Sequence, residues 1–214
     1  MLAFALSAFS AIFSVVDPFG VVPVYVAMTA SDSREHKRRT ALRASVTMAL
    51  TLGIFAAVGA YILRFFGLSM GAFRIAGGAL LFLLAVDMLR AQPSRQRSTP
   101  EEEREGLEKP DVSIFPLAIP MLSGPGSFAT VMVLMSRTTN LWERGIVFAA
   151  IAVTAALTFA ILLGATHAER RLGRTGINVL HRLMGFLLAA IAVQFVCDGL
   201  RDVLPSVLSS VRSC

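Results

Sequence analysis

Long stretches without charge constrain the fold of this chain more than any other feature. Residues 1–31 contain one charged side chain, Asp17, and five further apolar stretches cover residues 44–63, 73–89, 112–136, 145–166 and 183–200. A helix needs about 20 apolar residues to cross the hydrocarbon core of a bilayer. Only 16% of the residues are charged, against about 25% in soluble domains. We therefore predict an all-α membrane protein with six transmembrane helices.

The first and fourth predicted helices contain strong breaks in the middle of the membrane. At the first break, Asp17 can cap a new half-helix and Pro18 can occupy its first position, with Gly20 following. The fourth helix carries the run Ser123-Gly124-Pro125-Gly126-Ser127, which provides the same signal with glycine as the cap. Each break therefore starts a half-helix whose free N–H groups and positive dipole end point into the protein interior.

The two halves of the sequence resemble each other. Placing the first helix over the fourth brings Pro18 onto Pro125, and placing the third over the sixth brings Arg74-Ile75-Ala76-Gly77 onto Arg182-Leu183-Met184-Gly185. Because each unit has an odd number of spans, the second unit of three helices must lie upside down relative to the first. This is the inverted-repeat plan of many secondary transporters. We predict a first repeat at 1–90, a cytoplasmic hydrophilic linker at 91–111, an inverted second repeat at 112–202 and a C-terminal tail at 203–214.

Positive charge predicts the orientation of the helices. Fourteen Lys and Arg residues fall in the loops after the first, third and fifth helices, and six fall on the opposite side. Because cytoplasmic loops carry the excess of positive charge, both termini are expected outside, as in a multi-pass protein of the bacterial inner membrane. The net charge of +6 therefore reports topology, and we expect membrane lipid rather than nucleic acid as the surroundings.

The breaks are the predicted binding site. An ionisable group inside a membrane is a functional candidate, so Asp17 could hold an ammonium or a proton, although it could also serve only as a helix cap. Gly20, Gly124 and Gly126 could let the backbone approach a ligand or only relieve crowding. Gln194 could line the site or join two helices, whereas the following glycines are expected to pack helices together: Gly77, Gly78 and Gly185.

Motifs for enzyme chemistry are absent from the sequence. It contains no HExxH, GxSxG, P-loop or dinucleotide fingerprint. His36, His167 and His181 are expected to lie isolated in or beside cytoplasmic loops, without a metal or acid–base role. We predict no enzyme activity, no cofactor and no metal.

Four segments resemble the MarC family of bacterial and archaeal membrane proteins: VVDPFGVVPVYVAMT, FRIAGGALLFLLAVDML, FPLAIPMLSGPGSFATVMVLMS and LHRLMGFLLAAIAVQFVCDGL. The likeness covers nearly the whole chain, and the linker from Gln92 to Asp111 is its least family-like part. Some relatives, of the SnatA type, transport small neutral amino acids, and the family resembles the LysE/RhtB amino acid exporters. The resemblance implies transport of a small zwitterion such as glycine or alanine.

That implication defines the leading hypothesis and its alternatives. The residues expected to hold the substrate are Asp17, Pro18, Gly20, Ser123, Gly124, Pro125, Gly126, Ser127 and Gln194. Alternating access would move one three-helix unit against the other, with Asp17 as a candidate proton carrier. The alternatives are a channel-like pore and a membrane scaffold that transports nothing. Phe-rich helix faces suit lipid and a second copy of the chain equally, so the sequence leaves homo-oligomer formation open.

Overall fold

A computed structural model describes residues 1–91 and 111–212, with the backbone alone at 166, 168–172, 174 and 205–212, so most of the predicted linker lies outside the described residues. The described residues form helices and no strand. Five of these helices are long and apolar enough to cross a membrane, or six when one bent pair counts as a single span. The elements are α1 (Leu2–Val16), α2 (Pro18–Met28), α3 (Arg34–Phe65), α4 (Met70–Leu89), η1 (Ser113–Leu122), α6 (Pro125–Ser136), α7 (Leu141–Leu163) and α8 (Ala165–Arg212).

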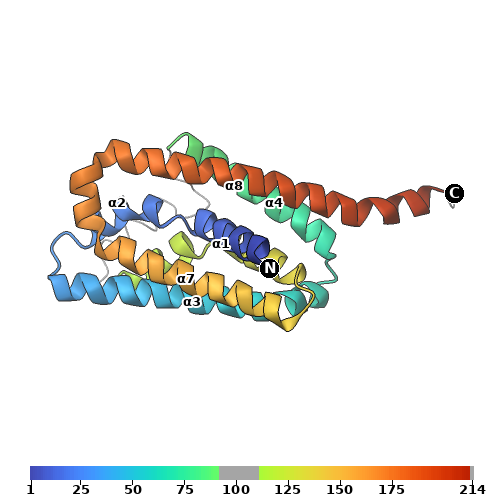
Figure 1. The fold of residues 1–214 in the computed structure, drawn as a ribbon, viewed down its shortest axis with the longest axis horizontal. Coiled ribbons are helices and arrows are strands. Elements are labelled where there is room, and N and C mark those ends of the chain that lie inside the picture. Colours follow the sequence, from blue (N-terminus) through green and yellow to red (C-terminus); the bar gives the residue numbers. More distant parts are fainter. Residues whose placement is uncertain (92–110, 213–214) are drawn as a thin grey trace.

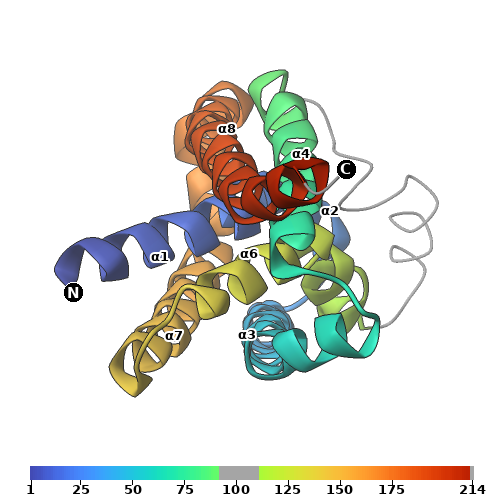
Figure 2. The same ribbon diagram turned by 90° about the vertical axis from the view of Figure 1, so that its right-hand side faces the viewer.

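The helices form three layers. Figure 1 shows α4 beside α8 on one face and α3 beside α7 on the other, and Figure 2 shows α1, α2 and α6 between these two pairs. The span built by α1 and α2 is the most enclosed, with 56% of its most apolar window buried against 28–33% in the four other long spans. The segments with predicted breaks therefore occupy the middle of the bundle.

Both central segments change their backbone course where the sequence has its breaks. Asp17 has left-handed dihedrals (φ 44°, ψ 68°) between the end of α1 and the start of α2 at Pro18. In the second segment, α6 starts at Pro125 and lies at 59° to η1. The η1 segment is irregular, with extended dihedrals at Phe115 and Ile119 and a cis peptide bond after each of them.

Two predicted basic loops are helical, so the predicted starts of two helices are wrong. The segment 34–43 belongs to α3, which begins after the Ser33 cap, and the Glu35–Arg39 ion pair lies one turn apart on it. The segment that contains Arg170, Arg171 and Arg174 belongs to α8, whose helical course is interrupted at Gly173 (φ 62°). Lys and Arg are good helix formers, so these helices continue beyond the apolar stretch.

Close contact between α4 and α8 depends on glycine. A Cβ atom on Gly78 would lie 2.8 Å from the carbonyl oxygen of Ala192, and one on Gly185 would lie 3.1 Å from that of Ala85. The two helices run antiparallel, because Gly71 meets Gly199 at one end of the contact while the Gly185 region meets the other end of α4. Gly77 instead faces Ala129 of α6. The predicted packing role of the three glycines is confirmed.

Substitution of Gly78 tests this packing. Gly78→Ala places a methyl group against backbone, so we expect a loss of about 1–3 kcal/mol in the free energy of unfolding. Gly53→Ala is the matched control, since its Cβ would meet only Phe148 at 3.9 Å and alanine favours a helix by up to about 1 kcal/mol. Unfolding in mixed detergent micelles measures both variants. Equal stability of the two variants would contradict the α4–α8 contact.

Candidate functional site at the helix breaks

A buried carboxylate and an imidazole meet at the first break. The Asp17 side chain is 0% exposed, and its Oδ2 atom lies 2.5 Å from Nδ1 of His181, which is 14% exposed. The other carboxylate oxygen of Asp17 accepts a hydrogen bond from the backbone N–H of Gly20 at 3.4 Å. Asp17 therefore caps α2, as predicted, and also connects the central segment to α8. A buried carboxylate requires such partners, because isolated charge is costly away from water.

Sequence reasoning missed His181. It was expected to be isolated in a loop, and this is wrong because α8 begins upstream of it and carries it onto Asp17. A signal was available in the spacing: His181 lies four residues before Gly185, so both share one helix face. Since Gly185 is a packing residue, His181 had to face the bundle too.

Gly20 leaves the space that this pair occupies. A Cβ atom on Gly20 would lie 2.3 Å from Oδ2 of Asp17 and 2.7 Å from Nδ1 of His181. No real Cβ makes such short contacts without movement of its neighbours. Gly20 is thus required for the close approach of the two side chains, which supports a steric role for the predicted residue.

The second break carries hydroxyl groups instead of a carboxylate. Ser123 is 0% exposed, and its hydroxyl donates to the carbonyl oxygen of Ala118 at 2.6 Å. The Ser127 hydroxyl donates to the carbonyl oxygen of Leu122 at 3.2 Å. Gly124, which precedes Pro125, is extended and offers no side-chain cap. Both serines therefore satisfy carbonyls of η1, and the first turn of α6 keeps N–H groups without a side-chain cap.

The two breaks are neighbours in space. A Cβ atom on Gly126 would lie 3.4 Å from Cγ2 of Val15 and 3.1 Å from Cδ2 of Leu81. Val15 stands two residues before Asp17, and α1 packs against α6. The start of α6 therefore faces the end of α1, two residues before Asp17 in the chain.

Gln194 lies away from the breaks. It is thirteen residues beyond His181 on α8, which corresponds to about 20 Å along a helix. Its side chain is exposed and donates to Asp198 at 2.8 Å. Asp198 also forms an ion pair with Arg137. The structure thus brings the predicted residues 17–20 and 123–127 together and leaves Gln194 in a separate polar cluster.

That polar cluster joins three helices at one end of the bundle. Arg74 of α4 pairs with Asp202 of α8 at 2.6 Å and donates to the Ser136 hydroxyl of α6 at 2.8 Å. Arg137, directly after α6, lies with its guanidinium 5.0 Å from the centre of the Phe195 ring. The distribution of Lys and Arg between the loops predicts that this end of the bundle lies on the outer side of the membrane.

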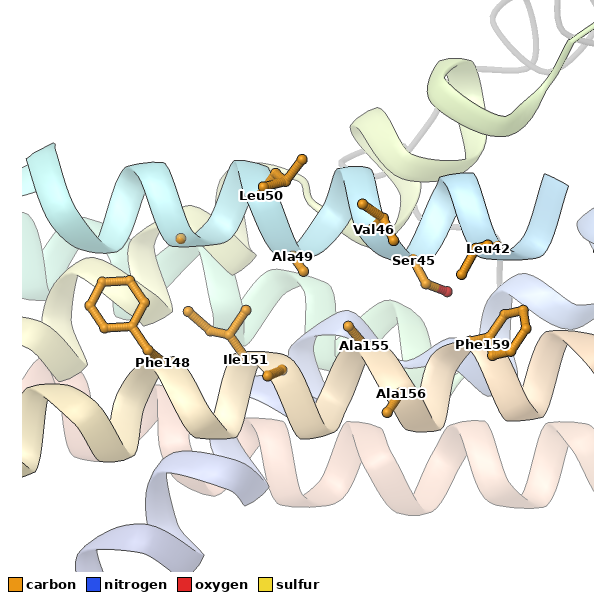
Figure 3. A pocket seen from close by; sticks show the side chains of 12 residues that line it. Leu42, Ser45, Val46, Ala49, Leu50, Phe148, Ile151, Ala155, Ala156 and Phe159 are labelled. Carbon is orange, nitrogen blue, oxygen red and sulfur yellow. The ribbon is translucent and has the colours of Figure 1, made fainter. Parts of the chain in front are cut away.

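A hollow between α3 and α7 does not have the chemistry of the predicted site. It measures about 390 Å³, and Figure 3 shows Ser45, Ala49 and Ile151 among the side chains in the space between the two helices. The lining contains one hydroxyl, that of Ser45, and no charge. The lining residues are Leu42, Ser45, Val46, Ala49, Leu50, Gly53, Phe148, Ile151, Ala152, Ala155, Ala156 and Phe159. Such a surface suits hydrocarbon and offers no partner to the charges of a zwitterion.

The comparisons with known proteins agree with a membrane bundle of this kind. The model of the family described as MarC family integral membrane protein matches residues 2–204. The chain belongs to the MarC family. It is an integral, multi-pass membrane protein, and its predicted membership of this family is confirmed.

Relatives in distant organisms match over almost their full length. A UPF0056 membrane protein of Methanocaldococcus jannaschii is 39% identical over 203 residues, which cover 95% of this chain and 98% of the relative. One from Aquifex aeolicus is 37% identical, covering 92% of each chain, and YhcE of Escherichia coli is 32% identical, covering 94% of each. Their names describe membrane proteins and state no substrate. No solved structure matches the chain.

A double-mutant cycle tests the contact of Gly20 with His181. Gly20→Ala is expected to cost about 1–3 kcal/mol of unfolding free energy, since the methyl group displaces both side chains of the pair. In the background of His181→Ala the same substitution should cost about 0.5–2 kcal/mol less, because one of its two clashes is gone. Unfolding in mixed micelles gives the four free energies. Strict additivity would contradict the geometry, and Gly145→Ala, with open space around its Cβ, serves as control.

Proposed function

We propose that this protein is a secondary transporter of small neutral amino acids, with the substrate held between the two breaks. The buried carboxylate of Asp17, two residues beyond the Val15 side chain that faces the start of α6, is the observation that carries the proposal. A zwitterion offers an ammonium to a carboxylate and a carboxylate to the N–H groups at a half-helix start. The resemblance to SnatA-type transporters points to the same substrate class.

Tight packing at the breaks supports a small substrate. The positions where Cβ atoms on Gly20 and Gly126 would stand are within 2.3 Å and 3.1 Å of neighbouring atoms. A substrate such as glycine or alanine needs less rearrangement there than one with a long side chain. A closed state around the breaks also fits alternating access, in which the site opens to one side at a time.

The helix contacts support an inverted repeat of three plus three helices. The contacts form matched sets when each element of the first half is exchanged for its counterpart in the second. The contact of α1 with α7 matches that of η1 with α3. The contact of α2 with α8 matches that of α6 with α4. The contact of α1 with α6 likewise matches that of η1 with α2, while α3 with α7 and α4 with α8 pair across the halves. Exchanging the two halves reproduces most of the contacts, which supports a two-fold axis in the membrane plane, although within the described residues the contact of α1 with α8 has no comparable counterpart between η1 and α4.

The arrangement of charge supports the proposed orientation, with both termini on the outer side. Arg43, in the third turn of α3, pairs at 2.6 Å with Asp111, just before η1. Hydrogen bonds from Ser113, assisted by Arg43, lower the pKa of Asp111. The basic segment 34–43 and Asp111, the last residue of the linker predicted at 91–111, are therefore linked at one end of the bundle. The charge rule assigns this end to the cytoplasm of a bacterial inner membrane.

A proton is the coupling ion in this proposal. Asp17 and His181 lie within hydrogen-bonding distance and can hold one proton between them. A proton bound at Asp17 neutralises the carboxylate when no ammonium is there. The substrate ammonium and the proton then bind at the same carboxylate, that of Asp17. Coupled transport requires such a link between the two binding events.

Counterflow of labelled alanine in proteoliposomes tests the transport function. The protein should exchange internal unlabelled alanine for external labelled alanine with saturable kinetics. Asp17→Asn, which keeps a capping side chain tolerant of left-handed dihedrals, should reduce exchange at least tenfold, whereas Asp111→Asn should leave it within twofold. Flux without saturation or counterflow would favour the channel-like pore. Absence of flux in a folded protein would favour the scaffold.

A separate measurement tests proton coupling. With a pH-sensitive dye inside the vesicles, alanine addition should move protons in the unmodified protein and in Asp111→Asn. His181→Gln should retain counterflow better than proton movement, since glutamine can still bond to Asp17 without carrying a proton. Equal proton movement in His181→Gln and the unmodified protein would rule out the pair as the coupling site.

A further inference from the structure

A second hollow, which is polar, lies at the end of α2, the start of α3 and the end of α7. It measures about 530 Å³, and six of its lining residues carry the argument: Tyr25, Arg34, Lys37, Arg38, Leu162 and Leu163. Tyr25 follows Asp17 by eight residues on α2, about 12 Å along a helix. This hollow is therefore distinct from the breaks. The buried Tyr25 fixes its wall, because its hydroxyl donates to the carbonyl oxygen of Lys37 at 2.8 Å.

The lining carries positive charge that the described residues do not neutralise. Arg34, Lys37 and Arg38 form no ion pair within the part of the chain that the structure describes. Their basic neighbours on α3 are paired, Arg39 with Glu35 at 3.0 Å and Arg43 with Asp111 at 2.6 Å.

The hollow also contains one carboxylate and one histidine. The carboxylate is that of Asp32, whose Oδ2 lies 3.7 Å from Nε2 of His36, a residue outside the lining. The histidine of the lining is His167. Three unpaired cations against one carboxylate give the hollow an excess of positive charge. Its ligand chemistry is therefore that of an anion with several acceptor oxygens.

The same hollow has an apolar wall that faces the membrane. Leu163 is the last residue of the α7 span and is 47% exposed on the surface, whereas Leu162 beside it is buried. The basic side chains stand at the start of α3, beyond the apolar stretch of that span. The hollow thus crosses the boundary between hydrocarbon and water, with its charge on the water side.

We propose that this hollow binds the phosphodiester head group of an anionic glycerophospholipid. Arg34, Lys37 and Arg38 hold the phosphate oxygens, and an acyl chain lies along the exposed side chain of Leu163. Basic pockets between membrane helices on the cytoplasmic side are suited to such head groups. A free phosphate ester shares the anionic group but leaves Leu163 uncovered, so this exposed leucine favours the lipid.

Native mass spectrometry of the full-length protein in detergent tests the proposal. Phosphatidylglycerol should be retained on the protein at lower concentration than phosphatidylcholine, and glycerol 3-phosphate should not compete at equal concentration. Arg34→Gln combined with Arg38→Gln should weaken phosphatidylglycerol binding about tenfold or more, since each basic residue contributes to the attraction. Arg39→Gln removes the same charge one residue away, outside the lining, and should stay within twofold.

Each outcome decides the proposal. Equal weakening by Arg39→Gln would reduce the effect to net charge and overturn the site, as would equal retention of the two lipids. Competition by glycerol 3-phosphate would assign the site to a soluble phosphate ester. Arg38→Gln alone, at an exposed position, replaces the double variant if that does not fold, with a smaller loss expected. The assay measures no transport, so it remains decisive if the proposed function fails.

Discussion

The burial of the Asp17 carboxylate is the constraint on which the rest of the bundle depends. A charge with no exposure inside an apolar bundle must find partners, and the chain supplies two of them from different elements. The N–H of Gly20 comes from α2, and the imidazole of His181 comes from α8. The left-handed backbone at Asp17 ends α1 and directs the carboxylate at both. One residue therefore fixes the break, the cap and the position of a third helix.

Helix α8 extends this constraint across the molecule. Its glycines bring it against the backbone of α4, and its His181 brings it against the first break. Further along the same helix, Asp198 and Asp202 hold Arg137 and Arg74, which flank the end of α6 and the start of α4. A shift of α8 that moves His181 would therefore also move the aspartates of this polar cluster. The helix provides a physical connection between the breaks and one end of the bundle.

Sequence reasoning reached the helical class, the helix start at Pro18 and the packing glycines, because these depend on local signals. An Asp-Pro pair such as Asp17-Pro18 favours a helix start, and small residues on one face indicate close helix contact. It missed the partnership of His181 with Asp17, 164 residues apart, because that contact depends on how α8 crosses the first segment. It also expected Gln194 as a possible site residue, since an isolated amide in an apolar stretch does not reveal which side of its helix faces the protein. The helical course of 34–43 was missed because charge was interpreted as loop, although these residues favour helix.

The two breaks share a backbone plan but differ in chemistry, and this difference bears on the substrate. At the first break a carboxylate is buried beside an imidazole. At the second, serine hydroxyls satisfy the carbonyls of η1, and Gly124 leaves the start of α6 without a side-chain cap. One break therefore offers negative charge and the other offers free N–H groups at a positive dipole end. A ligand with one ammonium and one carboxylate matches such a pair, whereas an ion of a single charge could use only one of the two.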